Sequence, residues 1–381
     1  MQMKIGFDAS QIGQNKTGCG YFALSLLNAL ASIDKYFEYI LYPTFGDHYW
    51  EPKWKNPVSI IRQKNFRRGL GHHTYDTLQM FWRYPPQDLE NLLGDPDIIH
   101  ANNFYCPTTL KKARLVYTLH DLAFIEQPEH TLEETRVASF NGALYASLYS
   151  DRIIAVSEYT RGHFLKVFPY YPADKILVVY EGSRFSFKPR LSRPNSLPTY
   201  LMSNSFWLNV GTLEPRKNHF RLLQAYAKLK AEQLDILPLV LVGARGWLMN
   251  DFEKLIEDLG IQSDVIILGY VDDNALQWLY QNCFACIYPS LFEGFGLPVL
   301  EAMSLGAAVI TSNVTSIPEV VGDAGLLIDP YSPNEICEAM KNLLRDNHLR
   351  NELRAKAQTR SLSFSWETTA RKVLSIYESL V

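Results

Sequence analysis

Short apolar runs alternate with longer amphipathic stretches along most of this chain, and the pattern predicts strands and helices in turn. The first run, Lys4–Asp8, is typical of a buried strand; a glycine-rich loop to Gly20 follows, and Tyr21–Ile33 has the apolar spacing of a helix. Further strands are predicted in the first half at Ile98–His100, Leu115–Leu119, Arg152–Val156 and Ile176–Tyr180. This alternation favours a mostly parallel sheet covered by helices.

The alternation restarts after a segment rich in proline, serine, arginine and asparagine, from Lys188 to Tyr200, which we interpret as a linker. The later strands are predicted at Phe206–Val210, Leu239–Val242, Val265–Leu268, Phe284–Tyr288 and Ala307–Thr311. The later helices are predicted at His219–Leu234, Asp251–Leu259, Asn274–Gln281 and Leu297–Ser304. The chain therefore reads as two similar α/β halves. Ligands bind beyond the carboxyl ends of strands in such sheets, so we expect the halves to face a central cleft.

The segment Phe292–Glu301 lies at a predicted turn from strand to helix and carries the strongest chemical signal. Gly294 and Gly296 let the backbone approach a ligand, and the proline that follows suits the first turn of a helix. A helix start attracts phosphate, whereas the carboxylates of Glu293 and Glu301 suit hydroxyl groups. Phosphate and hydroxyls together indicate a nucleotide or a nucleotide-sugar. Taken alone, the segment also fits a purely structural turn.

Charged residues follow predicted strands in both halves. Arg216 and Lys217 come after the first strand of the second half, on the same predicted sheet edge as Glu293, where a diphosphate would meet both cations. In the first half, His120 and Asp121 directly follow a strand, and a neighbouring carboxylate can orient an imidazole or raise its pKa. A solvated loop and a structural histidine are the alternatives, and these residues alone leave them open.

Composition narrows the class of protein. The chain has 381 residues, of which 47% are hydrophobic, and a net charge of -3 with a pI of 6.3 gives no electrostatic case for nucleic acid. We find neither a signal pattern nor an apolar stretch of the roughly 18 residues that span a bilayer, and expect a cytoplasmic protein. The five cysteines do not form a disulfide framework, and Cys283 and Cys286 are expected to pack in a core.

Several ordered motifs together resemble a known family: the retaining, group 1 nucleotide-sugar glycosyltransferases with two Rossmann-like domains, the GT-B fold, and a Glu-x7-Glu signature. The motifs are Asp8–Ser10, Thr17–Gly20, Leu119–Leu122, Ala155–Arg161, Asn209–Asn218, Glu293–Glu301 and Phe364–Trp366. The resemblance covers nearly the whole chain. It implies an acceptor-binding domain at 1–187, a linker at 188–200, a donor-binding domain at 201–363 and a helix at 364–381 that crosses back to the first domain.

The resemblance also implies roles for individual residues. Glu301 would bind the ribose hydroxyls and Glu293 hydroxyls of the donor sugar, while Arg216 and Lys217 would hold the diphosphate. His120 would lie near the donor sugar at the reacting face. These assignments make His120, Arg216, Lys217 and Glu293 the catalytic candidates.

Further donor contacts are implied along both halves. Gly18 and Gly20 would let the first-domain loop approach the phosphates, and backbone groups around Tyr270 and Val271 would read the base. The donor-binding set is completed by Gly294, Phe295, Gly296 and Leu297. Many relatives carry an arginine where this chain has Thr212, and we expect Arg216 to substitute for it.

The implied reaction moves a hexose from a nucleotide-sugar to a saccharide or lipid-linked saccharide, in polysaccharide or cell-envelope glycan synthesis. UDP-glucose is favoured as the donor and GDP-mannose is next, with UDP expected as the product and no cofactor. Negative charge grows on the leaving diphosphate, and Arg216, Lys217 and the helix start at Leu297 can stabilise it without a metal. The resemblance implies retention of configuration. A nucleotide-sugar epimerase and a non-catalytic nucleotide-sugar-binding protein are the alternatives.

An aromatic and basic region from Tyr49 to Pro86 is the expected acceptor region. It contains Trp50, Trp54, Phe66, Arg67, Arg68, His72, His73, Phe81, Trp82 and Arg83. Aromatic faces suit sugar stacking, and basic side chains suit a lipid diphosphate or an anionic membrane. We therefore expect peripheral contact with the inner face of the plasma membrane, with a mobile loop as the alternative. Asn102 and Asn103 are weaker acceptor candidates.

Overall fold

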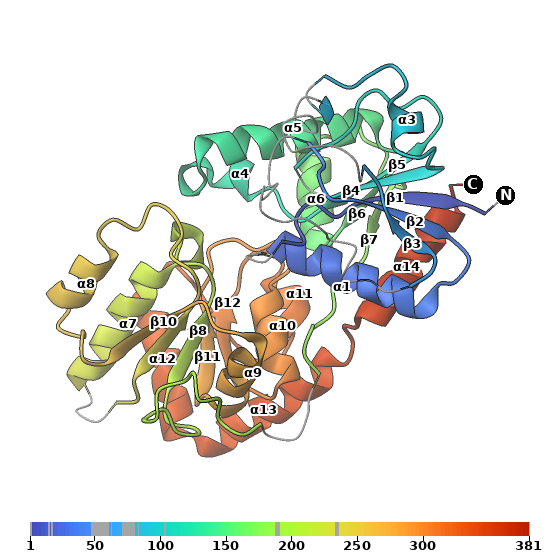
Figure 1. The fold of residues 1–381 in the computed structure, drawn as a ribbon. Helices are drawn as coiled ribbons and strands as arrows, with labels where there is room; N and C mark the ends of the chain where they lie inside the picture. The colour runs from blue at the N-terminus through green and yellow to red at the C-terminus, as the bar shows by residue number, and fades with distance from the viewer. Residues whose placement is uncertain are drawn as a thin grey trace. The chain divides into compact units, whose positions relative to one another are not determined.

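The structure is a computed structural model that describes residues 2–13, 16, 18–46, 61, 63–70, 81–82, 84–102, 104–186, 191–232 and 236–380. The chain forms two compact units (Figure 1). Unit 1 comprises Met1–Gly182 and Ser365–Val381, and unit 2 comprises Ser183–Phe364.

Unit 1 is built on a parallel sheet with the strand order β3-β2-β1-β4-β5-β6-β7. The strands are β1 (Lys4–Asp8), β2 (Glu38–Tyr42), β3 (Phe66–Arg68), β4 (Ile98–Asn102), β5 (Arg114–Leu119), β6 (Arg152–Ala155) and β7 (Ile176–Val178). The helices are α1 (Gly18–Ile33), α3 (Leu89–Leu92), α4 (Ala123–Glu126), α5 (Glu133–Tyr149), α6 (Glu158–Val167) and α14 (Trp366–Glu378), with a 3-10 turn at Pro128–His130. The inner strands are covered on both faces, which explains why they read as continuous apolar runs.

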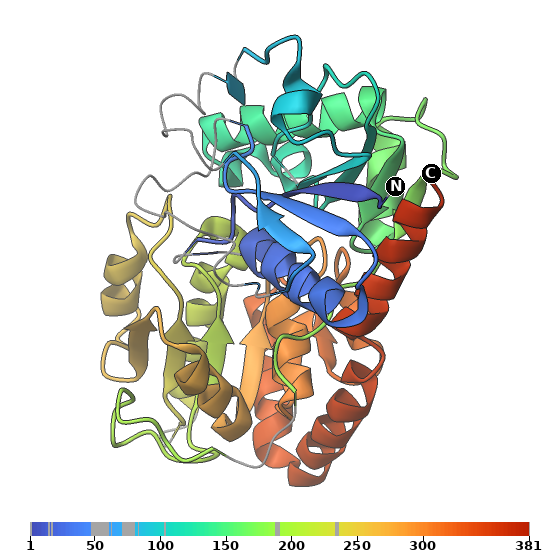
Figure 2. The same cartoon turned by 45° about the vertical axis from the view of Figure 1, so that its right-hand side comes forward.

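The C-terminal helix α14 belongs to unit 1 and packs against α1 (Figures 1 and 2). It starts at an N-cap, Ser365, whose side chain accepts from the backbone N–H of Thr368. Near its end, the hydroxyl of Tyr377 lies 2.5 Å from Nδ1 of His100 on β4, and Nε2 of His100 lies 2.7 Å from the hydroxyl of Thr118 on β5. A buried polar chain therefore ties the last helix to the middle of the sheet.

Unit 2 repeats the plan with the strand order β10-β9-β8-β11-β12-β13, and helices lie on both faces of the sheet (Figure 2). The strands are β8 (Trp207–Val210), β9 (Leu239–Val242), β10 (Val265–Gly269), β11 (Ala285–Tyr288), β12 (Val309–Ser312) and β13 (Leu326–Ile328). The helices are α7 (His219–Glu232), α8 (Phe252–Asp258), α9 (Asp273–Asn282), α10 (Leu297–Ser304), α11 (Ile317–Val321), α12 (Pro333–Arg345) and α13 (Asn347–Ser361), with a 3-10 turn at Pro215–Lys217. Each unit has its own apolar core.

Both sheets reverse their strand order once, between β1 and β4 in unit 1 and between β8 and β11 in unit 2. Loops leave such a pair of neighbouring strands in opposite directions, which opens a crevice at the carboxyl edge of the sheet. The two predicted α/β halves with parallel sheets are confirmed.

Some elements were not predicted. No strand was predicted at β2, β3 or β13, and no helix at α11, α12 or α13. β3 and β13 have three residues each and lie at the edges of their sheets, so they leave little pattern in the sequence. β3 is one example: its sequence is Phe-Arg-Arg, and as an edge strand it pairs only with β2.

The predicted linker also differs from the structure. The chain passes between the units at Gly182 and Ser183, and the described part of the predicted linker, residues 191–200, lies in unit 2. Residues 187–190 lie outside the described part of the chain. Beyond them, Leu197 is buried, and the backbone N–H of Leu191 donates to Gln281 at 3.2 Å. Proline interrupts helices and strands here without detaching the segment from the core.

We expect Tyr377→Phe to lower the free energy of unfolding by about 1–3 kcal/mol, because it leaves a buried imidazole nitrogen without its partner. Burial, and then the charge of His120, lower the pKa of His100 to about 3, so this imidazole is neutral and needs that hydroxyl. Urea denaturation of the full chain measures the effect. Tyr36→Phe is the matched control, since Tyr36 is 81% exposed. Equal stability of the two variants would remove the anchoring role from Tyr377.

Candidate active site

The polar residues singled out in the second half gather at the point where the sheet of unit 2 reverses its order. Arg216 and Lys217 lie in the 3-10 turn after β8, and Glu293 lies in the loop after β11. β8 and β11 are paired neighbours, so the two loops leave the same edge of the sheet. The backbone N–H of Leu291 donates to the carbonyl of Arg216 at 2.8 Å and joins the loops directly.

Glu293 is the centre of this cluster. Its Oε1 accepts hydrogen bonds from Nζ of Lys217 at 2.7 Å, from the hydroxyl of Ser290 at 2.6 Å and from the hydroxyl of Tyr288 at 2.8 Å. Its Oε2 accepts from Nη1 of Arg216 at 3.1 Å. The three charged residues that the sequence placed at one sheet edge are therefore in direct contact.

Charge balance in the cluster explains why a carboxylate can stay buried there. Glu293 is 7% exposed, and burial raises its pKa. The charges of Lys217 and Arg216 lower that pKa, and so do hydrogen bonds from Lys217 and Ser290. These interactions outweigh burial and bring the pKa of Glu293 to about 2. Arg216 also donates from Nη2 to Glu214 at 2.8 Å. The cations are thus held in place by carboxylates, and their remaining N–H groups are oriented before a ligand arrives.

The turn from Glu293 into α10 needs a glycine at its end, where the backbone has a positive φ. Gly296 is the N-cap of α10 with φ of 106°, and a Cβ there would lie 2.6 Å from Cδ1 of Ile317. The loop is anchored at Glu293, whose N–H donates to Thr315 at 3.1 Å and whose carbonyl accepts from Ser316 at 2.8 Å. The first turn of α10 contains no acidic residue, so its N–H groups present an unopposed positive end.

Glu301 lies on α10 with its carboxylate already engaged. Its Oε1 accepts from Nε of Arg184 at 2.5 Å, and Nη1 of Arg184 donates to Asp273 at 2.8 Å. The hydroxyl of Tyr280 lies 3.4 Å from Oε2. Burial raises the pKa of Glu301, and Arg184 opposes that shift. Sequence reasoning missed Arg184, because it lies in a segment without regular structure and carries no motif.

The remaining donor-side candidates lie at the same carboxyl edge or in the core. Thr212 follows β8, and Tyr270 and Val271 follow β10, with the ring of Tyr270 59% exposed. Phe295 is different, since it is 3% exposed and packs edge-on against Phe364 at 5.8 Å. Its side chain therefore supports the turn from within, and the ligand contacts assigned to these residues stay predictions.

A second polar cluster lies at the carboxyl edge of the sheet in unit 1, around His120. Nε2 of His120 lies 2.8 Å from Oδ1 of Asn102, the last residue of β4, and Nδ1 lies 3.5 Å from Oε1 of Glu181. Phe22 on α1 meets the imidazole edge-on, with ring centres 4.8 Å apart. Acceptors at both nitrogens favour the doubly protonated ring.

Burial lowers the pKa of His120, but interactions with Cys19 and Glu181 raise it by more, to about 10. The imidazolium therefore persists at neutral pH. The partner carboxylate is Glu181, whereas the adjacent Asp121, which the sequence suggested, accepts from the backbone N–H of Ala123 at 3.0 Å. No local spacing signals Glu181, since it meets His120 only through the pairing of β5, β6 and β7.

The two glycines of the first loop differ in what requires them. A Cβ on Gly20 would lie 2.2 Å from the carbonyl oxygen of Gln11, so only glycine fits there. A Cβ on Gly18 would meet no atom within 4 Å. The loop therefore needs Gly20 for its fold, and the expected approach of both glycines to phosphate stays a prediction.

Much of the expected acceptor region lies outside the described residues. That holds for Tyr49, Trp50, Trp54, His72, His73, Arg83 and Asn103. Among the described residues of the region, Trp82 and Phe66 are buried in the core, and Nε1 of Trp82 donates to Thr44 at 2.9 Å. These two rings pack inside unit 1, which corrects their expected role as sugar-stacking faces. No helix in the described part of the chain is long and apolar enough to cross a membrane.

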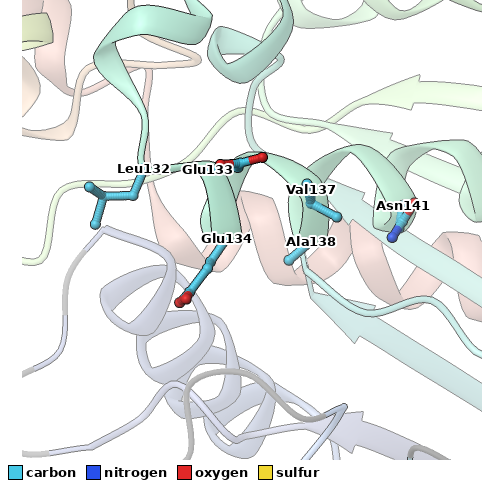
Figure 3. A pocket seen from close by; sticks show the side chains of 6 residues that line it. All are labelled: Leu132, Glu133, Glu134, Val137, Ala138 and Asn141. Atoms are coloured by element: carbon cyan, nitrogen blue, oxygen red, sulfur yellow. The ribbon is translucent and has the colours of Figure 1, made fainter.

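A cavity of about 740 Å³ lies along the first half of α5 in unit 1 (Figure 3). Its lining consists of Leu132, Glu133, Glu134, Val137, Ala138 and Asn141. None of these residues was a predicted site residue, because carboxylates followed by apolar positions are typical of an ordinary surface helix. The cavity combines carboxylates with an apolar wall.

Comparison with known proteins gives consistent findings. The model described as Glycosyltransferase Family 4 matches residues 18–183, and the model described as Glycosyl transferases group 1 matches residues 202–360. The chain is 36% identical to O-antigen chain mannosyltransferase B of Escherichia coli, over 99% of this chain and 100% of that protein.

Two solved structures share the fold. The structure of Alr3699/HepE of Anabaena in complex with UDP and glucose has a TM-score of 0.70 at 20% identity. The match covers 99% of this chain and 100% of that chain. The structure of WaaG, a glycosyltransferase involved in lipopolysaccharide biosynthesis, has a TM-score of 0.71 at 18% identity. That match covers 98% of this chain and 99% of that chain. The GT-B fold expected from the sequence is confirmed.

We expect Glu181→Gln to lower the pKa of His120, because the amide removes a negative charge from beside the imidazolium. An NMR titration of the full chain with labelled histidine measures the pKa in both proteins. The control is Glu129→Gln, which removes a carboxylate beside another histidine, His130. A His120 signal that titrates identically in the wild type and Glu181→Gln would show that Glu181 does not hold the imidazolium.

Proposed function

The chain belongs to the group 1 glycosyltransferases, and we propose that it transfers mannose from GDP-mannose to a saccharide or lipid-linked saccharide in O-antigen or related glycan synthesis. The observation that carries the proposal is the network of Arg216, Lys217 and Glu293 at the strand reversal of unit 2. It offers cations for a diphosphate and a carboxylate for sugar hydroxyls within one hydrogen-bonded unit.

We propose mannose as the donor sugar, in place of the glucose that the sequence favoured. The mannosyltransferase from Escherichia coli is similar over essentially the full length of both chains. The neighbour that holds UDP and glucose is 20% identical, so its likeness supports the fold and not the choice of sugar. Full-length similarity to a mannosyltransferase is therefore the stronger support.

Glu293 in this proposal is a ligand of the donor sugar and not a nucleophile. Its Oε1 already accepts three hydrogen bonds, and two cations offset its charge. A carboxylate stabilised in this way attacks carbon poorly. Retention then follows from attack by the acceptor on the face that the diphosphate leaves, with the leaving group taking the acceptor's proton.

His120 acts as a proton-bearing cation in the same scheme. An imidazolium whose pKa is about 10 is a poor general base at neutral pH, but its positive charge can stabilise an oxygen that gains negative charge. Arg216 and Lys217 stabilise the departing diphosphate. We infer that the transfer needs no metal, because these side chains carry the positive charge that a metal would otherwise supply.

The cavity along α5 is the proposed acceptor site (Figure 3). Glu133 and Glu134 can accept hydrogen bonds from sugar hydroxyls, and Leu132 and Val137 provide an apolar wall for a sugar ring. This location replaces the aromatic rings of Phe66 and Trp82, which are buried.

We expect GDP-mannose to give the largest rise in melting temperature within a panel of nucleotide-sugars, and the fastest release of nucleoside diphosphate once acceptor is added. Release in EDTA is expected to equal release with magnesium, and NMR of the product is expected to show the anomeric configuration of the donor. Faster turnover of UDP-glucose would overturn the choice of sugar, and donor conversion without acceptor would support an epimerase.

We expect Glu293→Gln to lower kcat/KM by about 100-fold or more, because it breaks the ion pairs that hold the donor-binding cations. Steady-state kinetics with saturating acceptor measure the loss. Glu253→Gln is the control, since it breaks a surface ion pair with Arg245 in the same unit. The proposed network has no role in turnover if both variants retain wild-type kcat/KM.

We expect the double variant Glu133→Gln and Glu134→Gln to raise the KM for acceptor about tenfold and to leave the KM for donor unchanged, because charged acceptors bind hydroxyls more strongly than amides. Initial rates against each substrate separate the two constants. Glu367→Gln, on the exposed face of α14, serves as the control. An unchanged acceptor KM would place the acceptor elsewhere.

A further inference from the structure

The irregular segment that begins unit 2 lies along α10 and is held there at two points. The hydroxyl of Ser183 lies 2.8 Å from the hydroxyl of Ser304. Nε of Arg184 donates to Oε1 of Glu301 at 2.5 Å. Ser304 and Glu301 are three residues apart on α10 and therefore share one face of the helix. The guanidinium of Arg184 also lies over the buried ring of Phe185, 4.5 Å from its centre, so this side chain has a fixed place against α10.

The guanidinium of Arg184 joins carboxylates on two helices. Its Nε donates to Glu301 on α10, and its Nη1 donates to Asp273, in the first turn of α9, at 2.8 Å. The side chain of Glu301 is 6% exposed, whereas that of Asp273 is 60% exposed. Exposed ion pairs contribute little, but a buried charge that loses its partner is costly. The contact with Glu301 is therefore the important one, and Asp273 helps to keep the guanidinium in line with it.

The two oxygens of Glu301 differ in what they already bind. Oε1 accepts from the charged donor of Arg184, whereas Oε2 has one long contact among the described residues, 3.4 Å to the hydroxyl of Tyr280. A carboxylate oxygen can accept two hydrogen bonds, so Oε2 keeps the capacity to bind another donor. Because the contact with Arg184 holds Oε1, it also fixes the direction in which Oε2 points.

We propose that Arg184 is a positioning residue of the donor site: it holds the carboxylate of Glu301 so that Oε2 accepts from the ribose hydroxyls of the nucleotide. The inference rests on the proposed function and on the predicted role of Glu301 in it. Arg184 makes no contact with the donor in this scheme and acts only through Glu301. Selection of a ribose over a deoxyribose then depends on a side chain that the nucleotide does not touch.

The charge of Glu301 depends on the same contact. Burial raises the pKa of Glu301, and Arg184 lowers it again in part. The other titratable groups that face this carboxylate are Asp273 and Tyr280 on α9 and Cys286 on β11, and none of them is a cation. Without Arg184 the pKa of Glu301 rises further, so the carboxylate takes up a proton at a higher pH. It then loses the charge that strengthens its hydrogen bonds to hydroxyl groups.

The first test measures ribose recognition without any transfer of sugar. Isothermal titration calorimetry on the full-length chain compares GDP with 2′,3′-dideoxy-GDP, and UDP with its dideoxy analogue. Wild type is expected to prefer the ribonucleotide about tenfold, and Arg184→Met to reduce that preference to about twofold, because the variant loses the charged donor to Glu301. The affinity for the dideoxy analogue is expected to stay within about twofold of wild type, since that ligand lacks the hydroxyls concerned.

Two further variants complete this test. Arg371→Met removes an exposed ion pair on α14 and is expected to keep the wild-type preference. Arg184→Lys keeps one charged donor and is expected to fall between wild type and Arg184→Met, so it decides the question if the methionine variant does not fold. An unchanged preference, an equal loss of affinity for both analogues, or tighter binding of GDP by the variant would overturn the proposal.

The second test separates positioning from a purely structural role. Affinity for GDP is measured from about pH 5 to about pH 9, and the midpoint of its loss on acidification is expected about one unit higher in Arg184→Met than in wild type. The two curves are expected to approach each other at alkaline pH, where Glu301 is ionised in both proteins. The phosphate of GDP titrates in the same way in both measurements. Equal midpoints would leave Arg184 only a structural role and refute the inference.

These measurements also distinguish failure of the inference from failure of the proposed function. If wild type binds neither GDP nor UDP, the proposed function fails. If it binds either nucleotide but has no preference for the ribose, the assignment of Glu301 and the inference fail together. If the preference exists and does not depend on Arg184, only the positioning role fails.

Discussion

The buried ion-pair network around Glu293 is the interaction on which the arrangement of unit 2 depends. A carboxylate with 7% exposure would be costly if it were alone, and removal of either partner from such a pair costs more than the pair itself contributes. The network joins the turn after β8 to the loop after β11, at the point where the strand order reverses. The charges therefore hold the two loops together at this edge of the sheet.

Unit 1 has the opposite arrangement of charges at the carboxyl end of β5, next to its strand reversal. There a cation, His120, is held by a carboxylate and an amide oxygen, whereas in unit 2 a carboxylate is held by two cations. Each arrangement keeps one charged form stable near neutral pH: ionised Glu293, and protonated His120. Cations suit the oxygens of a diphosphate and carboxylates suit sugar hydroxyls, and each cluster holds groups of both kinds.

The sequence revealed residues that lie directly after strands and missed those that meet them from far along the chain. His120, Arg216 and Glu293 follow apolar runs, and in parallel sheets that position alone places them at the carboxyl edge. Glu181 and Arg184 carry no comparable signal, because each lies in an irregular segment. Their partners, His120 and Glu301, are 61 and 117 residues away. Asp121 shows the limit of local reasoning: it is adjacent to His120 in sequence, but its side chain accepts from the backbone N–H of Ala123.

The contact with Arg184 affects the predicted role of Glu301 as a ligand of ribose hydroxyls. Oε1 of Glu301 accepts from Nε of Arg184 at 2.5 Å, whereas the hydroxyl of Tyr280 lies 3.4 Å from Oε2. Ribose hydroxyls would therefore have to bind at Oε2 or compete with the guanidinium for Oε1. Arg184 lies two residues beyond Gly182, where the chain passes from unit 1 to unit 2. A ribose that displaced Arg184 would break the ion pair between Arg184 and Glu301, next to the point where the chain passes between the units. A ribose that used Oε2 would leave this ion pair intact. Because burial raises the pKa of Glu301, its charge depends on a cation or donors close by, and loss of Arg184 without replacement would be costly. If Glu301 binds ribose as the sequence predicts, Oε2 is the oxygen that the hydroxyls would meet while Arg184 remains in place.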